Sequence, residues 1–97
     1  MSLRHFPASL VCVAALAGVV YSQPTPKTAL LVLSKHDHTL AIVDPASLRV
    51  VAREPVGNDP HEVIASSDGR TAYVSNYGFG AYHTLAVIGL VAQEALP

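Results

Sequence analysis

The chain has 97 residues, of which 51% are hydrophobic and 13% are charged, and its formal net charge is −1 at pH 7. It has no basic stripe along which nucleic-acid phosphates would bind, so the composition argues against a nucleic-acid partner. The single cysteine, Cys12, lies near the N-terminus, which leaves the rest of the chain without a disulfide, a thiol nucleophile or a thiolate metal site.

Residues 1–22 have the pattern of a secretory signal peptide. A weakly basic start at Arg4 and His5 precedes an apolar run over residues 6–20, and small residues lie close to Ser22. We expect cleavage after Ser22 and export to the periplasm or the extracellular space. The apolar run is shorter than the roughly 20 residues of a spanning helix, which favours a cleaved signal over an uncleaved anchor. No membrane contact is expected after cleavage.

A stiff linker, residues 23–27, follows the expected cleavage site, because Pro24 and Pro26 restrict the backbone there. Beyond it the chain is rich in residues that favour strands, and no helical periodicity is visible before the last few residues. The predicted strands are residues 28–33, 38–43, 48–53, 61–66, 71–76 and 82–88.

Turn residues separate these strands. Asp44 and Pro45 end the second strand, because proline cannot donate to the ladder. Asp68 and Gly69 between two strand-like runs predict a hairpin turn. Residues 89–97 lose both the turn signal and the alternation, which makes a final strand there doubtful.

The chain also repeats itself. Residues 38–43 match residues 83–88 at an offset of 45, and residues 27–31 match residues 70–74 at an offset of 43. The two-residue difference is expected in the loop at residues 77–81, since loops tolerate insertions. A period of about 40–45 residues with about four strands per unit is typical of β-propeller blades. The alternative is two unrelated hairpins of similar composition.

Residues 68–76 read Asp-Gly-Arg-Thr-Ala-Tyr-Val-Ser-Asn and resemble the repeat named for its Tyr-Val-Thr-Asn core, with Ser75 where threonine is usual. Residues 42–45, 56–57 and 60–61 also resemble elements of this YVTN repeat. The resemblance covers residues 27–88. It implies an all-β fold of antiparallel propeller blades, with a partial blade at residues 28–55 and a second blade at residues 61–97, in a family that is commonly seven-bladed and often exported.

Fewer than two four-stranded blades are present in this chain. At least about three repeats are normally needed for stability, and a closed ring takes about four to eight blades. We therefore expect either further blades, in a longer product of which this chain is a truncated or frame-shifted part, or self-association of several copies.

The resemblance implies that the loops at residues 34–37, 57–60 and 77–81 open at one end of the ring, where propeller ligands bind. We therefore expect a protein or small-molecule ligand at that loop face. The candidate ligand-binding residues are Asn58, Asp59, His61 and Tyr77, and the resemblance places His36 and Asp37 in the same neighbourhood.

His36 and His38 are the candidate metal ligands. Residues two apart on a strand point the same way, and imidazole suits Zn, Cu or Fe. The alternative is a polar turn, because a metal site needs three or four ligands. His61 is either a ligand-binding or general-base residue or a hydrogen-bonded residue at a strand start.

No serine triad, phosphate-binding glycine loop or HExxH motif is present, so the sequence assigns no catalytic residue and no cofactor. The expected function is an exported, non-catalytic module for binding or scaffolding. One alternative is the N-terminal part of a propeller enzyme, either a lactonase-like hydrolase or a haem- or copper-associated periplasmic oxidoreductase. Another is a truncated product without function.

Overall fold

The computed structural model describes residues 23–97, which form an all-β structure of two antiparallel sheets. The two sheets confirm the all-β prediction. The predicted signal peptide, residues 1–22, lies outside the described residues. Within the described part of the chain, no helix is long and apolar enough to cross a membrane.

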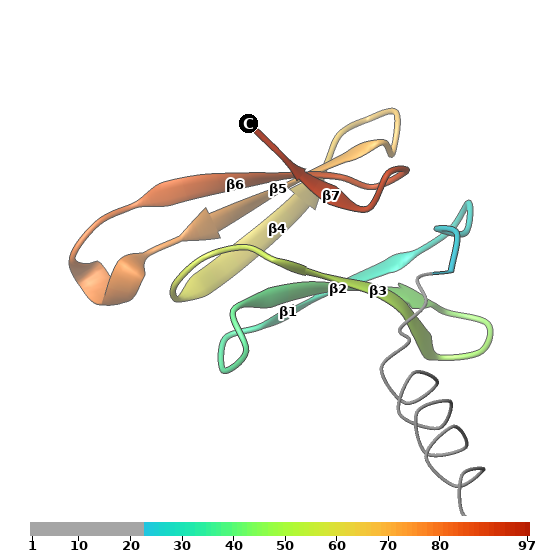
Figure 1. The fold of residues 1–97 in the computed structure, drawn as a ribbon, viewed down its shortest axis with the longest axis horizontal. Helices are drawn as coiled ribbons and strands as arrows, with labels where there is room; N and C mark the ends of the chain where they lie inside the picture. The colour runs from blue at the N-terminus through green and yellow to red at the C-terminus, as the bar shows by residue number, and fades with distance from the viewer. Residues whose placement is uncertain (1–22) are drawn as a thin grey trace, which may run out of the picture.

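The first sheet has the strand order β1-β2-β3, and the second has the order β4-β5-β6-β7 (Figure 1). All six predicted strands form, with ends that differ from the predicted ones by at most two residues. The strands are β1 Leu30–Ser34, β2 Thr39–Asp44, β3 Arg49–Pro55, β4 Pro60–Ala65, β5 Thr71–Asn76, β6 Thr84–Gly89 and β7 Glu94–Leu96, and a short 3-10 helix, η2, spans Gly78–Gly80.

The two sheets pack face to face, with β1 against β4 and β3 against β7 (Figure 1). Each strand sends alternate side chains into the space between the sheets, as the period of a strand requires. The side chains that fill this space are apolar in both sheets. The buried core consists of Leu40, Ile42, Val51, Ala52, Ala72, Val74, Ile88 and Leu90.

The segment that follows β6 forms a turn and a short strand, where the sequence made a strand doubtful. The Leu48 amide donates to the carbonyl of Asp44 at 2.7 Å, and the Gln93 amide donates to the carbonyl of Gly89 at 2.8 Å. Leu48 and Gln93 both have a φ of 60°. The two turns therefore share one geometry 45 residues apart, although only the first contains Asp-Pro. This backbone geometry returns the chain into β7 without the proline.

Strand pairing corrects the register of one internal match. Leu30 pairs with Val43 in the first sheet, and Ala72 pairs with Ile88 in the second. Because Val43 and Ile88 are 45 residues apart, the structural counterpart of Leu30 is Ala72, at an offset of 42 and not 43. A slip of one residue moves every side chain of a strand to the opposite face. The similar residues of the two segments show that they correspond, but only the hydrogen-bonded strand pairing shows which residue corresponds to which.

The connection between the sheets is fixed by Asn76 at the end of β5. Its side-chain amide, almost fully buried, donates to the carbonyl of Val56 at 3.0 Å and lies 3.2 Å from the Thr84 hydroxyl. Gly57 beside it has a φ of 140°, and a Cβ at this position would lie 2.8 Å from the Asn76 Nδ2 atom. The buried amide thus occupies the space that a side chain at position 57 would need.

We expect Gly57→Ala to lower the free energy of unfolding by about 3 kcal/mol, because it combines a backbone conformation that only glycine adopts readily with a clash against Asn76. The matched control is Gly69→Ala, where φ is 72° and nothing lies within 4 Å of the added Cβ. It should cost only about 1 kcal/mol. Denaturant unfolding of the full chain at one fixed concentration measures both. Equal losses would contradict the role of the buried amide.

Candidate functional site

Three loops meet at one end of the two sheets, around Asp59. The β1–β2 turn contributes Lys35, the connection between the sheets contributes Asp59, and the β5–β6 loop contributes Phe79. Two backbone bonds tie the last two segments together: the Tyr77 amide donates to the carbonyl of Asp59 at 3.0 Å, and the Gly78 amide donates to that of Asn58 at 3.2 Å. The loop face predicted from the sequence is thus a continuous surface.

The Asp59 carboxylate is the centre of this surface, and its side chain is only 10% exposed. Its Oδ1 atom lies 3.0 Å from Lys35 Nζ and 3.2 Å from His61 Nε2, while its Oδ2 atom accepts the Phe79 amide at 3.2 Å. One carboxylate therefore contacts groups from both sheets and from the longest loop. A buried carboxylate is retained only with such partners.

These contacts favour the charged carboxylate. The hydrogen bond from Lys35 is the main cause that lowers the pKa of Asp59 below its ordinary value of 3.8, and the Phe79 amide and the charge of Lys35 add to it against the opposing effect of burial. Asp59 is therefore ionised at neutral pH, and the loop face carries a fixed negative charge beside the Lys35 ammonium.

An aromatic stack lies next to Asp59. His61 and Tyr77 stack with ring centroids 4.1 Å apart and planes at 12°, and Tyr77 meets His83 edge to face at 5.3 Å. The pairing of β4 with β5 shifts register between Pro60 and Glu62, so His61 is a bulged residue. Bulges turn a side chain away from its strand direction. This one lets His61 lie against Tyr77 and Asp59 together.

The tip of the β5–β6 loop presents an aromatic side chain to solvent. Phe79 has a left-handed backbone, with a φ of 56°, and is 74% exposed. This conformation is costly for a residue with a bulky side chain, and such strain is found at functional sites. Nearby, the side-chain amide of Asn58 donates to the Tyr82 hydroxyl at 2.8 Å, and the Tyr82 ring covers Gly78. The Tyr82 ring therefore packs against this loop, whereas most of the Phe79 side chain is exposed to solvent.

The nitrogen of His61 that faces Asp59 also faces Lys35, with Nε2 3.0 Å from Lys35 Nζ. An ammonium only donates, so Nε2 either accepts from Lys35 without a proton or carries a proton and donates to Asp59. In the second arrangement Nδ1 is the basic nitrogen, which is how a carboxylate orients a general base. The cluster offers a cation, an anion and stacked rings for ligand recognition.

The candidate metal ligands lie in the β1–β2 turn, which also carries Lys35. His36 and His38 belong to the turn at residues 35–38, and His38 has a φ of 58°, so strand alternation does not align their side chains as expected. His36 is almost fully exposed and lies 3.1 Å from the Asp37 carboxylate. In residues 23–97, no three His, Cys, Asp or Glu side chains gather as a metal site would require. The metal site stays a prediction.

The structure brings together all four candidate ligand-binding residues: Asn58, Asp59, His61 and Tyr77. It adds two that the sequence did not single out, Lys35 and His83. The sequence held one indication that Lys35 belongs to the site, because Lys35 lies in the loop at residues 34–37 that was expected at this end of the sheets. Nothing in the sequence indicates that His83 contacts Tyr77.

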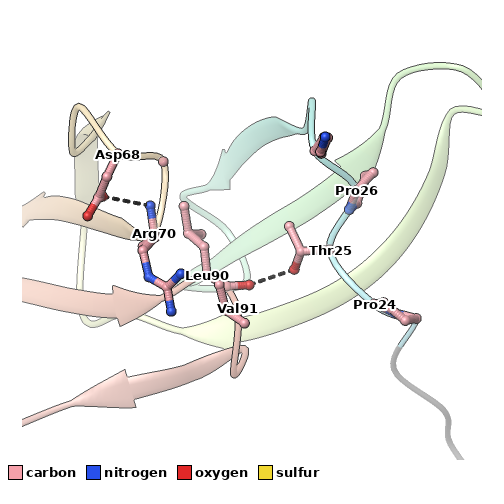
Figure 2. A pocket seen from close by; sticks show the side chains of 9 residues that line it. Pro24, Thr25, Pro26, Asp68, Arg70, Leu90 and Val91 are labelled. Carbon is pink, nitrogen blue, oxygen red and sulfur yellow. Dashed lines mark hydrogen bonds between the residues drawn. The ribbon is translucent and has the colours of Figure 1, made fainter.

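A hollow lies at the opposite end of the strands, between the segment at residues 24–27 and the β4–β5 and β6–β7 turns (Figure 2). Its volume is about 490 Å³. The Thr25 hydroxyl donates to the carbonyl of Leu90 at 2.6 Å, and Asp68 accepts the Arg70 amide at 3.0 Å. These bonds fix the N-terminal segment and the Asp68-Gly69 hairpin turn, whose prediction is confirmed. They show a structural role for Thr25 and Asp68.

No protein-family model matches this chain, and a search of curated proteins finds no match either.

Because the pKa of Asp59 is lowered in the folded state, its contacts stabilise the fold above about pH 3.8 and are lost as the pH falls through the folded-state value. We expect a carboxyl ¹³C NMR titration to place this pKa below 3.8. In Lys35→Met, which removes the main cause, it should move upward, and acid unfolding should begin at a higher pH.

Asp68 is the internal control for this titration. Its pKa is also lowered, mainly by the Ser66 hydroxyl and then by the Arg70 amide, at the far end of the strands from Lys35. Lys35→Met should leave the titration of Asp68 unchanged. An Asp59 pKa that does not respond to loss of Lys35 would show that their contact has no electrostatic effect.

Proposed function

We propose that this chain is an exported YVTN-type β-propeller repeat module that acts in binding or scaffolding. Two stacked antiparallel sheets, with equivalent turns 45 residues apart, support the repeat architecture. Under this proposal the second sheet is a four-stranded blade, and the first is a blade without its innermost strand. The ring is completed by further sheets, which come from self-association or from further blades.

The proposed export rests on the N-terminal sequence, with removal of residues 1–22 at the small residues before Gln23. The mature chain then begins at a polar segment that is anchored on the fold, since the Gln23 amide donates to the carbonyl of Val51 at 3.0 Å.

Expression of the full chain from Met1 in a bacterial host tests this processing. We expect intact-mass measurement and N-terminal sequencing of the exported protein to give Gln23 as the first residue, or its cyclised pyroglutamate form. Ser22→Trp, which places a bulky side chain at the cut, should block processing. Recovery of an uncleaved, membrane-bound chain would contradict the proposal and favour the anchor.

The observation that carries a binding role is the exposed, strained Phe79 next to a rigid polar cluster. Phe79 is held in its left-handed conformation by the bond from its own amide to Asp59. Around it lie the Lys35 ammonium and the stack of His61 on Tyr77. Apolar and charged groups that are fixed before a ligand arrives lose little entropy on binding. Such a surface suits a protein segment or a small molecule with an apolar part and a charged group.

A photoreactive benzoylphenylalanine at position 79 tests the loop face in the exporting cell. We expect a discrete adduct whose mass identifies a protein or a small molecule, and we expect Lys35→Ala or Tyr77→Ala to reduce its yield several-fold. The matched control is the same probe at Val91, which is similarly exposed but lies at the opposite end of the strands. Equal labelling from both positions would contradict a specific loop-face ligand.

A propeller enzyme remains the second candidate, and the contact of His61 with Asp59 is the observation that favours it. General-base catalysis typically contributes about 10²–10⁴-fold in rate. The test is whether the full chain hydrolyses a lactone and whether His61→Gln lowers that rate by about the same factor. Such a result would favour a hydrolase over the binding proposal. Hydrolysis that is unaffected by this change would exclude His61 as the base.

A further inference from the structure

Each sheet has an outer face, which points away from the other sheet. Within residues 23–97, no further sheet packs on either outer face. The outer face of the first sheet contains two cross-strand rows. One is Leu30, Val43 and Val50, and the other is Val32, Ala41 and Arg53. The outer face of the second sheet contains one long apolar row, Ile64, Tyr73, Val87 and Leu96, and a second row of Glu62, Ser75 and Leu85. Both faces are largely apolar, with one charged side chain on each, Arg53 on the first and Glu62 on the second. Ala41 and Val43 are buried, and most of the other apolar side chains are solvent-exposed. Contiguous exposed apolar surface of this kind marks an interaction site.

The outer face of the second sheet repeats the buried inner face of the first. Leu85 lies 45 residues after Leu40, and Val87 lies 45 residues after Ile42. Leu40 and Ile42 are fully buried against the second sheet, whereas Leu85 is 62% exposed. The residues are equally apolar in both places. The second sheet therefore presents to solvent the kind of surface that the first sheet already buries.

The converse holds for the outer face of the first sheet, which repeats the buried inner face of the second. Val32 pairs with Ala41 as Val74 pairs with Ala86, which makes Val32 the counterpart of Val74. Val74 is fully buried against the first sheet, whereas Val32 is 42% exposed. By the same pairing, Leu30 is the counterpart of the buried Ala72. The two outer faces thus match the two halves of the contact inside the chain.

We infer that the outer face of the first sheet binds the outer face of the second sheet of another copy of this chain. This contact repeats the one inside the chain. On the first sheet, Leu30 and Val32 would take the places of Ala72 and Val74. On the second sheet of the other copy, Leu85 and Val87 would take those of Leu40 and Ile42. It joins two different faces and is therefore heterologous. Copies add head to tail and close into a ring or grow as an open stack.

A second copy fits better than a two-fold pairing of like faces. In a two-fold contact between two second-sheet faces, Tyr73 and Leu85 of one copy would pack against the same residues of the other copy. The contact inside the chain joins two different faces and contains no such packing of like residues. Every copy also carries both matching faces, so no other component is needed. The inference extends the proposed repeat architecture, but it rests on the strand pairing and burial, and its test is independent of any loop-face ligand.

Two charged substitutions test the polarity of the contact in the full chain, in the processed form that the cell produces. We expect sedimentation velocity to show that the unaltered chain forms species larger than a dimer. Leu85→Glu on one face and Val32→Glu on the other should each raise the apparent dissociation constant at least ~10-fold, because each places a charge in an apolar contact. Mixed in equal amounts, the two variants should form a heterodimer, since each retains the face that the other lacks.

Ile64→Lys and Leu30→Lys repeat the test on the same two faces should either glutamate variant fail to fold, which circular dichroism detects. Val91→Glu is the matched control, because Val91 lies in the β6–β7 turn and on neither outer face. It should leave assembly unchanged. A chain that stays monomeric at all concentrations overturns the inference. So does a pattern in which only the second-sheet variant loses assembly and mixing restores nothing, because that pattern identifies a like-to-like dimer.

Discussion

The apolar contact between the inner faces of the two sheets is the interaction on which the other features depend. Neither a three-stranded nor a four-stranded sheet is stable with both faces in water, because each must bury at least one face against another layer. Leu40 and Ile42 from β2 and Val74 and Ile88 from the second sheet supply that burial. Their packing also sets the position of each loop, since the strands that carry the loops are held by it.

The loop face follows directly from this packing. Lys35 extends from the first sheet and His61 belongs to the second, and they meet at Asp59 only because the sheets are stacked with β1 against β4. The carboxylate then stabilises the loop at Phe79 through its amide. Burial between the sheets thus brings together charges that are distant in sequence, and those charges hold the strained loop that presents an aromatic ring.

The same alternation that builds the core leaves rows of apolar side chains on both outer faces. In a sandwich of two sheets, the outward residues of each strand are usually polar. Here Leu30 and Val32 on one side and Tyr73 and Leu85 on the other face outward. A strand pattern that is apolar on both faces belongs to a sheet that is covered on both sides. The two-sheet unit therefore has the surface pattern of a sheet pair that further sheets cover.

The sequence by itself determined the all-β fold, the six main strands and the turns between them, because local alternation and turn residues encode these features. Tertiary structure alone decided that Leu30 corresponds to Ala72, that β7 forms without an Asp-Pro turn, and that Lys35 contacts Asp59. The expected alignment of His36 with His38 failed because a left-handed residue in a turn does not follow strand alternation. Register, long-range ion pairs and backbone bends depend on hydrogen bonds between segments, and no local pattern of residues specifies these.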